Sequence, residues 1–261
     1  MKTVFIAATM VAIVAVAPAG AGTITPFNAR PVQVGSSYDR GDGSCWGSSA
    51  ANCELQTLVN FVNPGAGINV NSDQQTAGMW SLGGALAASV VLDFKVAGGA
   101  GATTIGLWSA AGGDPAKLEK VELFNTDSRG LEFTSTTPAS LFFDPLTGKM
   151  TISGGWGVNT GTFSGIDPNA FGFYLSNTQN QDLFYSVDSL NPNITAQTLA
   201  FLNADSGWWT LGFEDTTYGV GDHDFQDALI QFTPVPEPAS LFLLGTGLAG
   251  LAGAIRRRSK R

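Results

Sequence analysis

Histidine and cysteine are nearly absent from this chain of 261 residues, which has one histidine and two cysteines. A hydrolytic zinc site needs two or three histidines, so the chain cannot supply one. A Ser–His–Asp or Cys–His system would have to use His223, and no Gly-x-Ser-x-Gly turn precedes a helix. A carboxylate pair for glycoside hydrolysis needs no histidine. We therefore predict that the protein is not an enzyme, with a secreted glycoside hydrolase as the alternative.

Basic residues are scarce in the body of the chain. Six of the 13 lysines and arginines, and one of the 21 acidic residues, lie in residues 1–21 and 234–261. Residues 22–233 therefore hold 7 basic and 20 acidic residues, a net charge of −13. Such a field repels nucleic acid and other polyanions, and it favours solubility or cation binding. We predict no nucleic-acid partner.

Long stretches with helical periodicity are missing from residues 22–233, whereas glycine, threonine, serine and asparagine are plentiful. Turn residues recur at intervals of about ten positions, which is typical of short antiparallel strands. The sequence predicts one all-β domain at 22–233, an antiparallel β-sandwich or jelly roll. We expect strands at 85–96, 103–108, 117–124, 131–134, 140–143, 150–152, 171–175, 183–187, 198–202, 208–213 and 228–232.

The first 21 residues have the organisation of a cleavable export signal. Lys2 gives a basic start, an apolar run extends from Val4 to Ala17, and Ala19–Gly20–Ala21 offers small residues to a signal peptidase. The run is shorter than the roughly 20 residues of a retained membrane span. We predict a signal peptide at 1–21, cleaved after Ala21, and therefore an exported protein.

Residues 234–261 have three parts. The prolines of Pro236–Glu237–Pro238 favour an extended spacer. Residues 239–255 are an uncharged stretch at the short end of what crosses a bilayer, and Arg256, Arg257 and Arg258 follow it. Basic residues behind an apolar stretch mark its cytoplasmic side. We predict a single transmembrane helix at 239–255 with the body of the protein outside the cytoplasm.

This order of Pro-Glu-Pro, apolar helix and arginine cluster resembles the PEP-CTERM sorting signal of Gram-negative bacteria that produce exopolysaccharide. The resemblance implies recognition by an exosortase-type membrane protease, with processing near Pro236–Glu237–Pro238. It also implies an inner-membrane-anchored precursor that passes to the cell surface or the extracellular space. An ordinary single-pass anchor behind a proline-rich linker is the alternative.

Cys45 and Cys53 stand just before the helical spacing of apolar residues at 54–61, which Asn63–Pro64–Gly65 ends. An exported chain passes through an oxidising compartment, which favours a disulfide between the two cysteines. Such a bridge stabilises the fold by about 2–3 kcal/mol in the loop-entropy description. Two free thiols are the alternative.

Acidic residues gather near the end of the body. Asp222, Asp224 and Asp227 lie at positions i, i+2 and i+5 after glycines, so their carboxylates can turn inward around one hard cation. In the strand that follows, residues 228, 230 and 232 share the face that we assign to the core, and residues 227, 229 and 231 take the other face. Aspartate also accepts bonds from its own downstream amides. The pattern therefore fits either a calcium site or a solvated turn.

Glu214–Asp215 together with residues 221–227 resembles the closing motif of a β-rich domain of unassigned function that often precedes PEP-CTERM tails. In that family a strand ending in Glu-Asp pairs with a Gly-Asp-x-Asp-Phe/Tyr-x-Asp turn. Gln226 is a departure, because a small amide or asparagine is usual there. The resemblance implies a structural calcium site and does not indicate any particular activity. The ligands that we assign to it are Glu214, Asp215, Asp222, Asp224 and Asp227.

The six tryptophans are many for one domain, and indole rings stack on sugars as well as fill cores. Trp208 and Trp209 put one ring on each face of a strand, so one ring faces outward unless a loop covers it. These residues support a second hypothesis, a carbohydrate-binding module for exopolysaccharide. The preferred interpretation is an exported cell-surface or extracellular-matrix protein of the biofilm type, with a structural calcium site.

Overall fold

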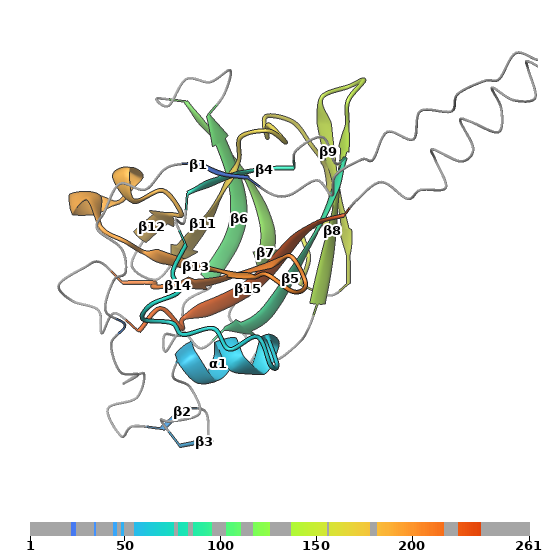
Figure 1. The fold of residues 1–261 in the computed structure, drawn as a ribbon. Coiled ribbons are helices and arrows are strands. Elements are labelled where there is room, and N and C mark those ends of the chain that lie inside the picture. Colours follow the sequence, from blue (N-terminus) through green and yellow to red (C-terminus); the bar gives the residue numbers. More distant parts are fainter. Residues whose placement is uncertain are drawn as a thin grey trace, which may run out of the picture.

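The computed structural model describes residues 22–24, 34, 44–45, 48–49, 55–75, 78–82, 86–95, 103–110, 117–125, 137–155, 157–177, 182–216 and 224–235. Two antiparallel sheets pack face to face as a β-sandwich, and a short helix lies against the outside of one of them (Figure 1). The β-sandwich that turn spacing and strand patterns predict is confirmed.

The larger sheet has seven strands, and its last strand in the sequence lies inside it rather than at an edge. Its members are β5 (Ala87–Lys95), β8 (Thr137–Asp144), β9 (Lys149–Gly154), β10 (Gly161–Phe163), β13 (Thr198–Asn203), β14 (Trp208–Phe213) and β15 (Ala228–Val235). Their order is β10-β9-β8-β5-β15-β14-β13. The predicted turn at 144–149 joins β8 to β9, and Gly148 provides its positive φ of 65°.

The smaller sheet has four strands in the order β12-β11-β6-β7. They are β6 (Thr103–Ala110), β7 (Leu118–Asn125), β11 (Gly172–Asn177) and β12 (Asp182–Tyr185). The other described elements are short. They are β1 (Gly22–Ile24) paired with β4 (Met79–Ser81), β2 (Ser44–Cys45) paired with β3 (Ser48–Ser49), the helix α1 (Leu55–Val62), and the 3-10 helices η3 (Asp188–Leu190) and η4 (Pro192–Ile194).

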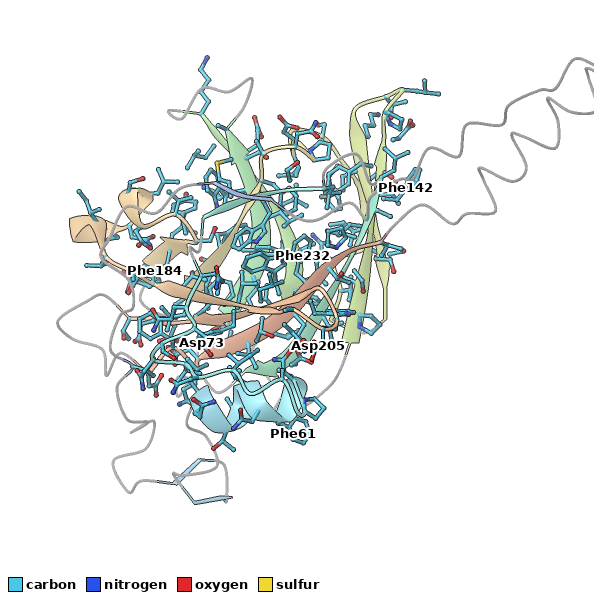
Figure 2. The ribbon with its side chains drawn as sticks, viewed as in Figure 1. Phe61, Asp73, Phe142, Phe184, Asp205 and Phe232 are labelled. Atoms are coloured by element: carbon cyan, nitrogen blue, oxygen red, sulfur yellow. The ribbon has the colours of Figure 1, made fainter. Side chains whose placement is uncertain are left out.

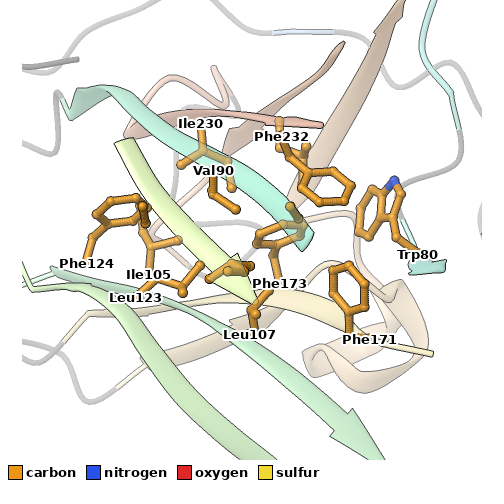
Figure 3. Close-up of a cluster of buried hydrophobic side chains, with 14 of the residues drawn as sticks. Trp80, Val90, Ile105, Leu107, Leu123, Phe124, Phe171, Phe173, Ile230 and Phe232 are labelled. Carbon is orange, nitrogen blue, oxygen red and sulfur yellow. The ribbon is translucent and has the colours of Figure 1, made fainter. Parts of the chain in front are cut away.

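One hydrophobic core fills the space between the two sheets (Figure 3). Ala228, Ile230 and Phe232 of β15 point into it, as their alternation along the strand predicts. The ring of Trp80 packs edge-on against Phe173 and Phe232, with ring centroids 5.4 and 6.5 Å away. Edge-on aromatic pairs contribute about 0.5–1.5 kcal/mol each beyond their buried area. This packing fixes the position of β15 and of the acidic residues that precede it.

The outer face of the seven-stranded sheet is covered by α1. Leu55 and Val59 of this helix are buried in a second apolar cluster that includes Leu229 of β15, a residue on the face away from the core. The helix ends as the sequence predicts: the backbone N of Asn63 donates to the carbonyl of Val59, and Gly65 has a φ of 80°. β15 is therefore buried on both faces.

The structure adds elements that the sequence pattern does not reveal. β4 and β10 have three residues each, which is too short for alternation to show. β15 also extends past residue 233, because Pro234 pairs with Ala88 and Val235 pairs with Ala87. The start of the segment assigned to the tail is therefore part of the sheet.

Some predicted features lie outside the described residues. These are the signal peptide at 1–21, the strand at 131–134, Cys53, and the tail from residue 236 with its apolar stretch. The disulfide between Cys45 and Cys53 therefore stays a prediction, as do the roles of Pro236–Glu237–Pro238 and Arg256–Arg258. In the part of the chain that the structure describes, no helix is long and apolar enough to cross a membrane.

Asp93 occupies a β-bulge between β5 and β15, where the register shifts between Leu229 and Ile230. Its side chain is buried, and burial raises its pKa from 3.8 to about 7. A carboxyl group shifted in this direction adds stability below about pH 4 that is lost as the pH rises to about 7. The full loss is about 4 kcal/mol, and an asparagine amide at the same place costs about 2 kcal/mol to bury.

We therefore expect Asp93→Asn to raise the free energy of unfolding by about 2 kcal/mol above pH 7. At pH 4 the charge penalty is absent, and the variant should be no more stable than the original chain. Urea denaturation at pH 4 and pH 8 measures both values. A gain of equal size at the two pH values would contradict a titrating Asp93.

Candidate metal centre

Acidic residues from two segments meet where β14 ends and β15 begins. The register pairs Phe213, the last residue of β14, with Ala228, the first residue of β15. Glu214 and Asp215 follow Phe213, and Asp227 precedes Ala228. Antiparallel pairing of the two strands therefore places these side chains at the same end of the sheet.

The carboxylates form a compact, buried group. One oxygen from each of Glu214, Asp215 and Asp227 lies within 4.8 Å of the others. The exposed fractions of these residues are 2%, 8% and 6%, and that of Asp224 is 0%. Carboxylates withdrawn from water destabilise the fold unless protons or a cation neutralise them. Burial of this negative charge therefore favours protonation of the group or binding of a cation.

Hydrogen bonds hold the carboxylates in position. The backbone N of Asp215 donates to Asp227 Oδ2 at 2.7 Å, and the backbone N of Gln226 donates to Asp224 Oδ1 at 3.1 Å. The side-chain amide of Asn177 donates to Asp215 Oδ2 at 3.0 Å. Asn177 is the last residue of β11, in the four-stranded sheet. The acidic group therefore joins the two sheets at this end of the sandwich.

The pKa of Asp227 reflects the electrostatics of the acidic group. Its burial raises its pKa well above the usual 3.8, and repulsion from Asp215, Glu214 and Asp224 raises it further. The hydrogen bond from the backbone of Asp215 acts in the opposite direction but does not offset these effects. Each described charged group that perturbs Asp227 is thus another carboxylate. A proton or a bound cation would offset this repulsion at neutral pH.

The backbone bends sharply beside the acidic group. Phe225 has a φ of 56°, in the left-handed region that residues other than glycine rarely adopt. Its ring is 1% exposed and packs in the cluster beneath α1. Burial of the ring therefore offsets the backbone cost of about 1–3 kcal/mol and holds the turn between Asp224 and Asp227.

The donor set determines which ions the group can accept. Among the residues that the structure describes, all the clustered ligand atoms are carboxylate oxygens, with no histidine nitrogen or cysteine sulfur, and His223 lies outside those residues. Oxygen donors favour hard divalent cations over the softer metals that prefer imidazole or thiolate. The buried group of Glu214, Asp215 and Asp227 can hold a metal ion of this hard class.

The structure treats the five predicted ligands differently. It brings Glu214, Asp215 and Asp227 together and buries Asp224 close enough to repel Asp227. Asp222 lies outside the described residues. Sequence reasoning does not find Asn177, because it is 38 positions from Asp215 and no motif marks it. Only the pairing of β11 within the other sheet brings it to the site.

The fold and the site define an all-β sandwich domain with a buried acidic group able to hold a metal ion. In comparisons with known families, residues 163–234 match a domain of unknown function, DUF4114. Residues 234–258 match the PEP-CTERM protein-sorting motif. The chain is thus a PEP-CTERM sorting-motif protein with a DUF4114 domain of unknown function. Searches of curated proteins and of solved structures found no match.

The two matched segments carry different information. The sorting motif implies processing by an exosortase and points to an exported, cell-surface protein. The DUF4114 segment begins at the end of β10 and runs nearly to the end of β15, and it includes the acidic group and Asn177. The earlier strands of the sandwich, from β5 to β9, precede the matched segment. The acidic group therefore belongs to the part of the fold that the family shares.

Proposed function

We propose that this is a cell-surface or extracellular-matrix protein, delivered by an exosortase, whose sandwich is closed at one end by a structural calcium ion. The observation that carries the proposal is the burial of Glu214, Asp215 and Asp227 within 4.8 Å of one another. The sorting motif supports the route of delivery.

Calcium fits this donor set better than magnesium does. Calcium accepts six to eight oxygens at about 2.3–2.6 Å in flexible geometry, which suits carboxylates and carbonyls from an irregular turn. Magnesium requires near-ideal octahedral geometry and retains several waters. A group whose carboxylates are at most 8% exposed leaves little room for that water. Calcium is therefore the ion that we assign.

The proposed ion acts as a clamp between segments. Glu214 and Asp215 follow β14, Asp227 precedes β15, and Asn177 connects the group to the other sheet. The tail departs from the opposite end of β15, after Val235, about 25 Å away for a strand of eight residues. The proposed calcium site is therefore at the end of the sandwich remote from the sorting tail.

The proposal includes no catalytic role. Buried carboxylates with exposed fractions of 2–8% cannot reach a polymeric substrate, and a glycosidase needs two carboxyl groups that face its substrate. We expect no release of dye from a panel of coloured glycosides, with or without calcium. Turnover that the substitution Asp227→Asn abolishes would overturn this part of the proposal.

The substitution Asp227→Asn tests the metal site directly. Its amide oxygen can still accept the hydrogen bond from the backbone of Asp215, but the charge that attracts a cation is gone. We expect the variant to lose the increase in melting temperature that calcium gives to the original chain. In excess EGTA the variant should melt at a higher temperature than the original chain, because one repelling carboxylate has been removed.

Asp167→Asn is the matched control. Asp167 lies in a turn and accepts a hydrogen bond from the backbone of Asn169 at 2.8 Å, as a solvated turn aspartate does. We expect its response to calcium to equal that of the original chain. Equal responses of both variants, or no response of the original chain, would overturn the proposed calcium site at Asp227.

A further inference from the structure

An open pocket of about 420 Å³, with polar and apolar lining, lies on the outer face of the seven-stranded sheet, between the end of α1 and the β13–β14 hairpin. This volume is within the range of small-molecule sites. Figure 2 shows Asp205, from that hairpin, on the side of the sandwich where α1 and Phe61 lie. The residues that line it include Asn63, Asn203, Asp205, Trp208 and Gln231.

Trp208 provides an aromatic wall of this pocket. Its neighbour Trp209 is buried in the core with 5% exposure, whereas Trp208 is only partly buried on the opposite face of β14. The indole N–H of Trp208 donates no hydrogen bond within the described part of the chain. An indole face with an available N–H suits a ligand that is apolar on one surface and hydroxylated at its edge.

The floor of the pocket is a rigid network of amides. Asn63 is 3% exposed, and its side-chain nitrogen donates to the carbonyl of Val59 at 3.1 Å and to Thr210 Oγ1 at 2.9 Å. Its Oδ1 accepts bonds from Asn203 at 3.1 Å and from Gln231 at 3.4 Å. These bonds fix the amide groups before any ligand arrives, so little ordering is needed on binding.

Hydrogen-bond acceptors remain available at the rim. The carboxylate of Asp205 is exposed and accepts no hydrogen bond within the described part of the chain. Gln231 is partly buried, and its Oε1 likewise accepts no hydrogen bond there. Both groups accept bonds from hydroxyls. The carboxylate of Asp205 repels anionic ligands, and the charge of −13 on residues 22–233 adds to that repulsion. The chemistry therefore excludes uronic acids and sulfated sugars.

We propose that this pocket binds a neutral pyranose unit of a polysaccharide, with its ring stacked on Trp208 and its hydroxyls donating to Asp205 and Gln231. The site goes beyond the calcium clamp and is independent of it. Trp208 begins β14 and the acidic group follows the end of the same strand, so the two sites lie at opposite ends of β14. The exported location brings the pocket into contact with polysaccharide outside the cell.

Affinity electrophoresis and titration of tryptophan fluorescence test the proposal with dextran and galactomannan as neutral probes and alginate as an anionic probe. We expect retardation and saturable quenching by at least one neutral probe, and neither effect with alginate. Trp208→Ala should weaken binding at least tenfold, and Trp208→Phe should retain part of it by keeping an aromatic face. Asp205→Asn changes an exposed side chain, so it leaves the fold intact and weakens binding through loss of a charged acceptor.

Phe61→Ala is the matched control, because Phe61 is an aromatic residue on α1 with 72% exposure that does not line the pocket. Its affinity should equal that of the original chain. No saturable binding of any neutral probe overturns the proposal, and so does equal binding by the original chain, Trp208→Ala and Asp205→Asn. Melting curves in calcium and EGTA on the same samples report the metal site separately, so failure of one proposal leaves the other standing.

Discussion

Removal of calcium is expected to lower the melting temperature of the sandwich by about 10 °C at neutral pH. An ion that binds only the folded state stabilises it by RT ln(1 + [L]/Kd), which is about 4 kcal/mol at a concentration 1,000 times Kd. In a domain of about 200 residues each kcal/mol changes the melting temperature by about 2–4 °C. Calorimetry in calcium and in excess EGTA measures the difference.

The size of this difference should depend on pH. Without metal, the pKa of Asp227 in the folded state is raised by burial and by the carboxylates of Asp215, Glu214 and Asp224. A carboxyl group of this kind adds stability below its unfolded pKa of about 4, and that stability is lost as the pH rises through the folded value. A bound cation stabilises the charged form and prevents the loss. Melting temperatures with and without calcium should converge near pH 4 and separate toward pH 8.

Magnesium is the control for this experiment. It should give a smaller shift than calcium at equal concentration, because it requires octahedral geometry and retained waters. A shift of the same size at pH 4 and pH 8 would contradict the assignment of the buried carboxylates as the ligands. Equal shifts with the two ions would contradict calcium and leave a less selective divalent site.

Alternation and turn residues predict most of the described fold because burial acts on them directly. The strand at 228–232 has apolar residues at every second position, and the structure places Ala228, Ile230 and Phe232 in the core. The order of the strands within the sheet cannot be predicted in this way. Nothing local in β15 indicates that it lies between β5 and β14, because strand order is decided by contacts between segments far apart in the sequence.

The acidic site is likewise predictable from the sequence only in part. Glu214, Asp215 and Asp227 are predictable because one strand connection brings their segments together. The contribution of Asn177 requires the second sheet to be in place, and no sequence spacing encodes that contact. The pocket at Trp208 follows the same pattern. Alternation predicts an outward ring, but its polar floor depends on Asn63, which is 140 positions from Asn203.

The substitution Phe232→Ala is expected to lower the free energy of unfolding by about 3–5 kcal/mol. Phe232 is 0% exposed, and its ring centroid lies 5.5 Å from that of Phe173 and 5.8 Å from that of Phe171, both edge-on. Truncation leaves a cavity among rings that cannot collapse into it from two opposed sheets. Denaturation by urea, with the slope held equal between the two proteins, measures the loss.

Phe142→Ala is the control for this substitution, since Phe142 in β8 is 50% exposed and its truncation should cost less than about 1 kcal/mol.

A second comparison combines Phe232→Ala with removal of calcium by EGTA. Phe232 is five residues from Asp227 along an extended chain, about 17 Å, so the two losses should add within about 0.5 kcal/mol. If the losses of stability from Phe232→Ala and from EGTA add, the calcium ion closes one end of a core that packs independently of it. A large departure from additivity would instead mean that the acidic group and the aromatic core are coupled, which contradicts a local clamp.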